Sequence, residues 1–170
     1  ILERHGHETC ALILEPRVQC AGGMRMHDPV YLKRVRELCD AHGVFLIADE
    51  IAVGFGRTGT RFACEQAGIQ PDLMCLSKGV TGGFLPMGVT LASAEIYDAF
   101  YAEERAKTFF HNTPYTGNAI ACAAALANLE VFEQEPVFQR IEAIVAHHAK
   151  RLQKLRGRPG IAEVRPTGTI

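Results

Sequence analysis

Several features that mark specialised protein classes are missing from this sequence of 170 residues. Lysine and arginine (18) nearly balance aspartate and glutamate (19), so the net charge of -1 gives no reason to expect a polyanionic partner. No apolar run approaches the roughly 18–20 residues of a membrane-spanning helix, and the first residues lack a signal-peptide layout. With 48% hydrophobic residues, the composition is that of an ordinary globular domain.

The six cysteines form neither a CxxC pair nor a cysteine–histidine spacing typical of zinc sites. Four of them lie in apolar runs, where a free cysteine packs as a small hydrophobe: Cys10, Cys39, Cys75 and Cys122. This usage favours a reducing compartment, most simply the cytoplasm.

A phosphate-binding GxxxxGK[ST] loop is also absent. The segment "FLIADE" (45–50) has the apolar run and paired acids of a magnesium site in P-loop ATPases, which keeps such an ATPase as an alternative. The chain begins without methionine and stops at "EVRPTGTI", where a further strand is expected. We therefore expect it to be a piece of a longer protein.

Strand and helix patterns alternate along the chain. Apolar runs predict strands at 10–14, 44–48, 73–76 and 87–93, and helical spacing predicts helices at 28–42, 62–67, 94–104, 117–135 and 136–157. This alternation predicts an α/β fold with a mostly parallel sheet and helices on both faces. It gives way to helices near Pro136, which suggests one domain over 1–135 and the start of another over 136–170.

Polar residues follow three of these strands: Glu15, Asp49-Glu50 and Ser77-Lys78. Ligands of open α/β sheets bind at the carboxyl ends of strands. Asp49 and Lys78 are 29 positions apart, which leaves room for one crossover between neighbouring strands. We therefore expect the carboxylate and the amine to meet at one edge of the sheet.

A carboxylate and an amine in this arrangement fit pyridoxal 5'-phosphate (PLP). Asp49 would keep the ring nitrogen protonated, and Lys78 would form a Schiff base with the aldehyde. Ile51, two residues after Asp49, would cover one ring face. The plainer alternative is that Lys78 is a solvated surface amine, as most lysines at strand ends are.

Two loops add polar groups. "GFGRTGTRF" (54–62) contains Arg57 and reads either as part of a binding site or as a glycine-rich turn around a buried structural arginine. "FFHNTPYTGN" (109–118) gathers hydroxyl and amide groups before an alanine-rich helix. It suits an anion site, or a capping loop in which Thr116 or Asn118 serves the helix.

Four blocks, "LILEPRVQCAGGM", "LIADEIAVGFGRTGTRFACE", "PDLMCLSKGVTGGFLPMGVTLAS" and "FFHNTPYTGNAIACAAA", resemble the class III aminotransferases of PLP fold type I in order and spacing. The resemblance implies that Lys78 is the Schiff-base lysine, Asp49 the partner of the pyridinium nitrogen, and Ile51 the ring-face residue. It also implies a partial large domain followed by the start of the C-terminal small domain.

The resemblance further implies a homodimer whose loop at Asn112, Thr113 and Pro114 reaches the substrate and cofactor phosphate of the other subunit. Pro114 departs from the hydroxyl residue usual in the class, so Thr113 is expected to supply the hydroxyl. Arg57 is the candidate for shaping the substrate site.

Within the class, the chain looks most like the biotin-pathway branch, which aminates 8-amino-7-oxononanoate with S-adenosylmethionine as donor. A class III enzyme that uses ω-amino acids or diamines with pyruvate is the alternative. Because the class builds its site from both subunits and from further segments, we expect these 170 residues alone to be inactive.

Overall fold

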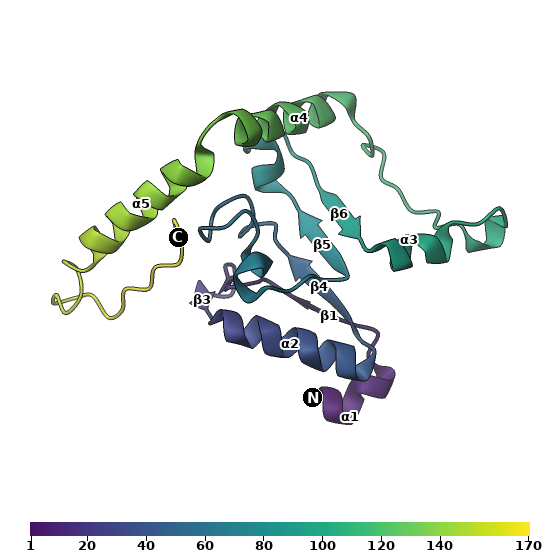
Figure 1. The fold of residues 1–170 in the computed structure, drawn as a ribbon, viewed down its shortest axis with the longest axis horizontal. Helices are drawn as coiled ribbons and strands as arrows, with labels where there is room; N and C mark the ends of the chain where they lie inside the picture. The colour runs from purple at the N-terminus through teal and green to yellow at the C-terminus, as the bar shows by residue number, and fades with distance from the viewer.

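The computed structural model describes all 170 residues and contains a four-stranded mixed sheet (Figure 1). Its strands are β1 (Ala11–Leu14), β4 (Phe45–Asp49), β5 (Leu73–Leu76) and β6 (Val89–Ala92), in the order β1-β4-β5-β6. β1, β4 and β5 are parallel, and β6 pairs antiparallel with β5. The α/β fold and mostly parallel sheet expected from the sequence are confirmed.

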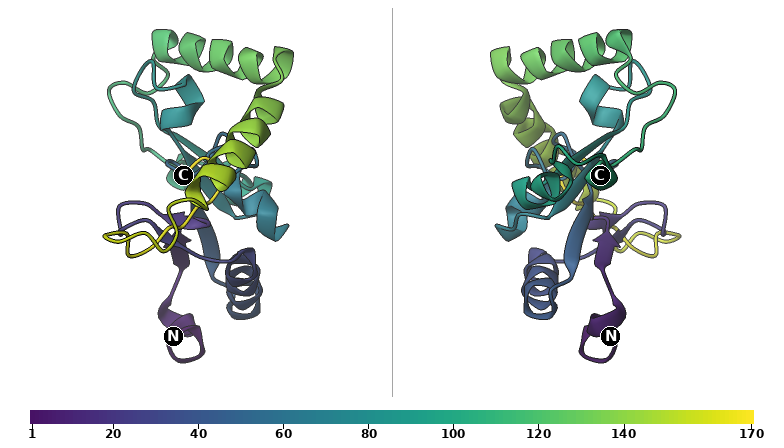
Figure 2. Two further views of the ribbon diagram at one scale, coloured as in Figure 1. Left: turned by 90° about the vertical axis from the view of Figure 1, so that its left-hand side faces the viewer. Right: turned by 90° about the vertical axis from the view of Figure 1, so that its right-hand side faces the viewer.

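Helix α2 (Pro29–His42) lies against one face of the sheet (Figure 2). Asp28 caps its first turn by accepting a hydrogen bond from the Val30 amide, and Gly43 ends it in the left-handed conformation at φ 64°. The core between α2 and the sheet contains Val35, Cys39, Val44 and Leu46, with Leu12 and Leu14 packed against it.

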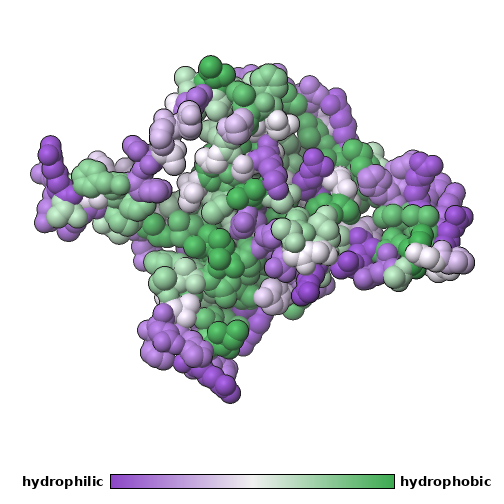
Figure 3. All heavy atoms as spheres, turned by 180° about the vertical axis from the view of Figure 1, so that it is seen from behind, coloured by the Kyte–Doolittle hydropathy of each residue, from purple (hydrophilic) through white to green (hydrophobic).

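The opposite face of the sheet is open in this chain, so the expectation of helices on both faces is not met within these residues. Ile13 and Phe45 point away from α2, because side chains alternate along a strand, and they are 62% and 42% exposed. The view from behind shows apolar atoms over the middle of the molecule (Figure 3). Asp49 lies on this open face, two residues beyond Ile47 in β4.

The remaining elements surround the sheet. They are α1 (Leu2–His5), η1 (Gly6–Glu8), the antiparallel pair β2 (Val18–Gln19) and β3 (Arg25–Met26), η2 (Ala63–Ala67), η3 (Lys78–Thr81), α3 (Ala94–Phe100), η4 (Arg105–Lys107), α4 (Ala119–Gln134) and α5 (Val137–Leu152). Helix α4 lies beyond the ends of the strands, and α5 leads back from it (Figure 1). No helix has both the length and the apolar character needed to cross a membrane.

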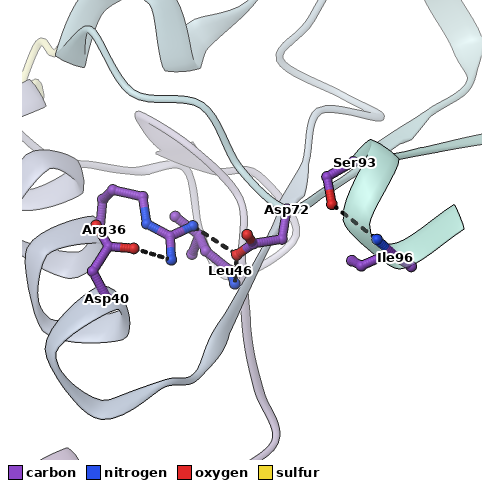
Figure 4. A network of polar contacts seen from close by, with 6 residues as sticks. All are labelled: Arg36, Asp40, Leu46, Asp72, Ser93 and Ile96. Carbon is purple, nitrogen blue, oxygen red and sulfur yellow. Dashed lines mark hydrogen bonds and ion pairs between the residues drawn. The ribbon is translucent and has the colours of Figure 1, made fainter. Parts of the chain in front are cut away.

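A polar network joins α2 to the sheet (Figure 4). The Asp72 carboxylate accepts hydrogen bonds from Arg36 (2.7 Å) and from the Leu46 amide (2.6 Å). Arg36 also pairs with Asp40 at 2.7 Å. The Asp72 carbonyl accepts a bond from the Ser93 amide (2.9 Å), so this one residue holds α2, β4 and the end of β6 together.

Three local expectations were wrong. The last residues form no strand: the Thr167 amide donates to the Ile170 carbonyl and the Thr169 amide donates to the Arg57 carbonyl, which makes a turn against the glycine-rich loop. Helix α3 ends at Phe100 rather than near Glu104, and Tyr101 there is extended with φ −84° and ψ 91°. Helix α5 ends at Leu152 rather than near Gly157, and turns follow it.

Candidate active site

Lys78 stands on a tight turn directly after β5. The turn η3 begins at Lys78 and closes at Gly82, which is left-handed with φ 61°. Lys78 itself has φ 40°, a region that residues with a side chain rarely adopt. Asn128 of α4 fixes this turn by donating from its side-chain amide to the Gly79 carbonyl (2.8 Å) and the Val80 carbonyl (3.2 Å).

The turn also lies very close to the glycine-rich loop. A Cβ added at Gly79 would come within 2.7 Å of the Phe55 Cβ, so no larger residue fits there without movement. Close approach is a role that only glycine fills, and here it brings the loop of Arg57 next to Lys78.

Lys78, Ile51 and Arg57 line one cavity of about 490 Å³. Residues of α4 and α5 also line the cavity, among them Phe132, Ile141, Ile144 and His148, and so does Thr169 near the chain end. Lys78 and Arg57 are both exposed, and the Arg57 guanidinium makes no ion pair or hydrogen bond within the chain. The reading of Arg57 as a buried structural arginine is therefore wrong.

Asp49 ends β4, the strand next to the one that leads to Lys78. Its Oδ1 accepts a hydrogen bond from the Ile51 amide at 3.1 Å, and it pairs in register with Cys75 of β5. It lines a neighbouring cavity of about 490 Å³ together with Glu15, Gln19 and Arg25. The carboxylate and Lys78 thus belong to adjacent strand ends but face two different cavities.

The Cys20 thiol lies within electrostatic reach of both groups. Its pKa is raised, first by burial and then by the Glu15 carboxylate and by Asp49, while the positive charge of Lys78 opposes the shift. The charges of Asp49 and Lys78 thus act on this thiol in opposite directions.

Glu50 is a residue whose role the sequence did not reveal. It is the only buried charged residue, with 0% exposure. Its carboxylate accepts hydrogen bonds from the Ala63 amide (3.0 Å) and the Cys64 amide (2.9 Å) at the start of η2. Burial raises the pKa of Glu50, and these two donors oppose the shift. Glu50 therefore binds the backbone directly after the glycine-rich loop (54–62) and fixes that end of the loop. Asp49, the residue before it, faces the open side of the sheet.

The loop at Asn112, Thr113 and Pro114 contributes no residue to the Lys78 cavity. All three residues are exposed. Thr113 lines a third cavity, of about 780 Å³, together with Ser77, the residue before Lys78, and the Thr113 amide donates to Thr116 Oγ1 at 2.9 Å. Asn118 caps α4 by accepting bonds from the amides of Ile120 (3.1 Å) and Ala121 (3.0 Å).

An α/β sheet with an amine and a carboxylate at adjacent strand ends suits a PLP-dependent enzyme. The model of the family described as Aminotransferase class-III matches residues 1–170, and the chain belongs to this family. It is 49% identical, over 100% of its own length, to the adenosylmethionine-8-amino-7-oxononanoate aminotransferase of Nitratidesulfovibrio vulgaris. This match covers 32% of that protein, and a P-loop ATPase is no longer an alternative.

Solved structures agree with the family assignment. A crystal structure of adenosylmethionine-8-amino-7-oxononanoate aminotransferase from Methanocaldococcus jannaschii superposes with a TM-score of 0.93 at 39% identity, over 98% of this chain and 39% of that one. An amine transaminase of an uncultivated Pseudomonas species, solved in its PLP-bound form, superposes with a TM-score of 0.85 at 41% identity. The match covers 93% of this chain and 36% of that one. The chain spans 32% to 38% of the length of curated relatives such as those of N. vulgaris and Geobacter sulfurreducens.

The residues present fit the cofactor of this family. Lys78 offers an exposed primary amine at a cavity wall, which a Schiff base to an aldehyde requires. Asp49 offers a carboxylate on the adjacent strand, which a protonated ring nitrogen requires. No other lysine lines any of the three cavities described above.

Proposed function

We propose that this chain is part of a PLP-dependent enzyme that transfers the amino group of S-adenosylmethionine to 8-amino-7-oxononanoate, giving 7,8-diaminononanoate for biotin synthesis. The carrying observation is the exposed Lys78 amine at the cavity shared with Ile51 and Arg57, beside the strand that ends in Asp49. The names of relatives that match the whole chain at 47% and 49% identity support the choice of substrates.

Lys78 and Asp49 would carry the chemistry. When bound, PLP supplies an electron sink for negative charge that develops on the α-carbon of the amino donor. Lys78 Nζ would hold the cofactor and would move the proton at that α-carbon. Asp49 would keep the ring nitrogen protonated, and Ile51 would cover one ring face. The same residues would serve the transfer to 8-amino-7-oxononanoate.

Arg57 is proposed to shape the substrate site. It lines the Lys78 cavity, and its guanidinium has no partner of its own in the chain. Asn112, Thr113 and Pro114 are proposed to act on the other subunit of a homodimer, Asn112 at the substrate and the other two at the cofactor phosphate. A shared site is supported by the absence of all three residues from the lining of the Lys78 cavity in one chain.

We also propose that residues 1–135 are the C-terminal part of the cofactor-binding large domain and that residues 136–170 begin the small domain. The break between α4, which ends at Gln134, and α5, which begins at Val137, supports this division. A cytoplasmic location is proposed from the unpaired state of all six cysteines.

The attachment of PLP to Lys78 is tested on the purified full-length protein that carries this chain. PLP is added, the sample is reduced with borohydride, and the modified peptide is identified by mass spectrometry. We expect one stable adduct, on Lys78. Lys78→Ala should lose it, whereas Lys33→Ala, which removes an exposed lysine of α2, should keep it. An adduct that persists in Lys78→Ala would refute the assignment.

The substrate pair is tested separately. Another class III reaction, with ω-amino acids or diamines and pyruvate, is the second candidate, because the amine transaminase is as similar in sequence (41%) as the M. jannaschii protein (39%). We expect amination of 8-amino-7-oxononanoate with S-adenosylmethionine and little amination of pyruvate. Preferential turnover of pyruvate with an amine donor would establish the second candidate instead.

A further inference from the structure

The last residues of the chain are bonded to the loop that carries Arg57. The Thr169 amide donates to the Arg57 carbonyl at 2.9 Å, and Thr169 Oγ1 donates to the same oxygen at 3.2 Å. These residues are 112 positions apart in sequence. The contact is therefore a tertiary one, made between the proposed start of the small domain and the glycine-rich loop.

Gly168 makes this contact possible. A Cβ added at Gly168 would lie 2.3 Å from the Thr58 carbonyl carbon and 2.4 Å from the Arg57 carbonyl oxygen. These are backbone atoms, which no side-chain rotation can move away. Two backbones touch here, and either a side chain at 168 or a displaced loop at 57–58 would separate them.

Both partners in this contact are anchored. Thr167 is 8% exposed and its Oγ1 bonds Met26 Sδ at 3.0 Å, while Ile170 packs against Val18, Val53 and Ala63. On the other side, Gln66 Nε2 donates to the Thr58 carbonyl at 2.8 Å. The Arg57 loop is thus held between a fixed turn and a fixed side chain, and the Arg57 side chain is left free at the Lys78 cavity.

From this arrangement we infer that Gly168 and Thr169 are positioning residues for Arg57: they set where its guanidinium lies in the Lys78 cavity and meets the substrate, without touching the reacting atoms. The inference rests on the proposed function of Arg57 in shaping the substrate site. It means that the small domain determines substrate affinity through one peptide contact, so movement of that domain shifts the arginine.

The test compares Gly168→Ala with Gly157→Ala in the full-length protein. Both glycines have positive φ (61° and 74°), but a Cβ at Gly157 would meet nothing within 4 Å. The two variants therefore share the backbone strain and differ in the steric contact. We expect Gly168→Ala to raise KM for 8-amino-7-oxononanoate about tenfold, the scale of one weakened charge-assisted contact, with kcat changed far less. Gly157→Ala should leave KM unchanged.

A double variant shows whether the effect passes through the arginine. In an Arg57→Ala background, Gly168→Ala should add almost nothing to KM, because the group that it displaces is already absent. Binding of 8-amino-7-oxononanoate, measured by calorimetry without an amino donor, should weaken in parallel and gives a readout independent of turnover. Equal KM values for Gly168→Ala and Gly157→Ala, or a full effect without Arg57, would overturn the inference.

A milder pair of variants decides the question if Gly168→Ala does not fold. Thr169→Val removes the hydroxyl bond and keeps the amide, and should raise KM two- to threefold, about half a kcal/mol. Thr169→Ser retains both donors and should restore the wild-type KM. An unchanged KM in Thr169→Val would also overturn the inference. In every variant the borohydride adduct of Lys78 is measured, so a failure of the positioning role is distinguished from a failure of the proposed function.

Discussion

At the scale of single residues, Glu50 is expected to matter for stability rather than for chemistry. Glu50→Gln keeps the side-chain size but leaves one of the two buried amides, of Ala63 or Cys64, facing a donor. Burial disfavours the charged form of Glu50, so removal of the charge by itself would not destabilise the fold. The amide that loses its acceptor, however, costs about 1–3 kcal/mol. We therefore expect the free energy of unfolding to fall by about that amount, as measured by urea denaturation.

The matched control is Glu65→Gln, on the same short helix but at an exposed position. It should change the free energy of unfolding by less than about 0.5 kcal/mol, as surface substitutions usually do. Equal losses in the two variants would contradict the supporting role of Glu50.

The positions of candidate site residues could be predicted from the sequence where they follow the end of a strand. Which side chains are buried could be predicted less well. Asp49 and Lys78 were placed on adjacent strand ends because apolar runs precede both, and β4 and β5 are indeed neighbours. The sequence does not tell which of Asp49 and Glu50 turns inward. One residue of register decides it, and the structure buries Glu50. The backbone contact of Arg57 likewise depends on Gly168, which lies 111 positions further along the chain.

At the scale of elements, helix α4 is expected to hold the Lys78 turn in place through Asn128. Asn128→Ala removes the donors to the Gly79 and Val80 carbonyls, each worth about 0.5–1.5 kcal/mol. We expect the free energy of unfolding to fall by about 1–2 kcal/mol and the yield of the Lys78 adduct to fall with it. Denaturation and quantitative mass spectrometry measure the two effects.

Glu130→Ala, an exposed change on the same helix, is the control for altered helix propensity. It should leave the adduct yield unchanged. An Asn128→Ala protein that forms the adduct as completely as wild type would show that the turn holds its shape without α4.

Elements with clear end signals were predicted well. The capping residue Asp28 and the terminating Gly43 predicted the bounds of α2 to within about one residue. The direction of β6 was not predictable, because an apolar run reads the same in parallel and antiparallel pairing. The strand expected at the end of the sequence does not form, for a different reason. The Thr169 amide donates to the Arg57 carbonyl and Ile170 packs against the core around Val53, and these contacts hold residues 167–170 in a turn.

At the scale of the whole molecule, the Asp72 network is expected to give the stability a dependence on pH. Burial alone would raise the pKa of Asp72, but hydrogen bonds from the Leu46 amide and Arg36 outweigh it, and the pKa is lowered. A carboxyl whose folded pKa lies below its unfolded value of about 3.9 stabilises the fold above that value. This stabilisation is lost as the pH falls through the folded pKa.

We therefore expect the free energy of unfolding to decrease on acidification below about pH 4, and Asp72→Asn to reduce that decrease. Denaturation curves collected between about pH 3 and pH 6 measure it. The exposed Asp98 of α3 makes no ion pair, and Asp98→Asn should retain the wild-type pH dependence. An unchanged slope in Asp72→Asn would contradict the role of the network.

The positive φ of Lys78 has a consequence for the evolution of this position. At φ 40° a lysine is disfavoured by roughly 1 kcal/mol relative to glycine, because its Cβ crowds the following carbonyl. Stability by itself would thus select glycine or asparagine at this turn. The proposed attachment of the cofactor gives a reason for a lysine at this position, so lineages that lose the reaction are expected to lose Lys78 early, and to gain stability when they do.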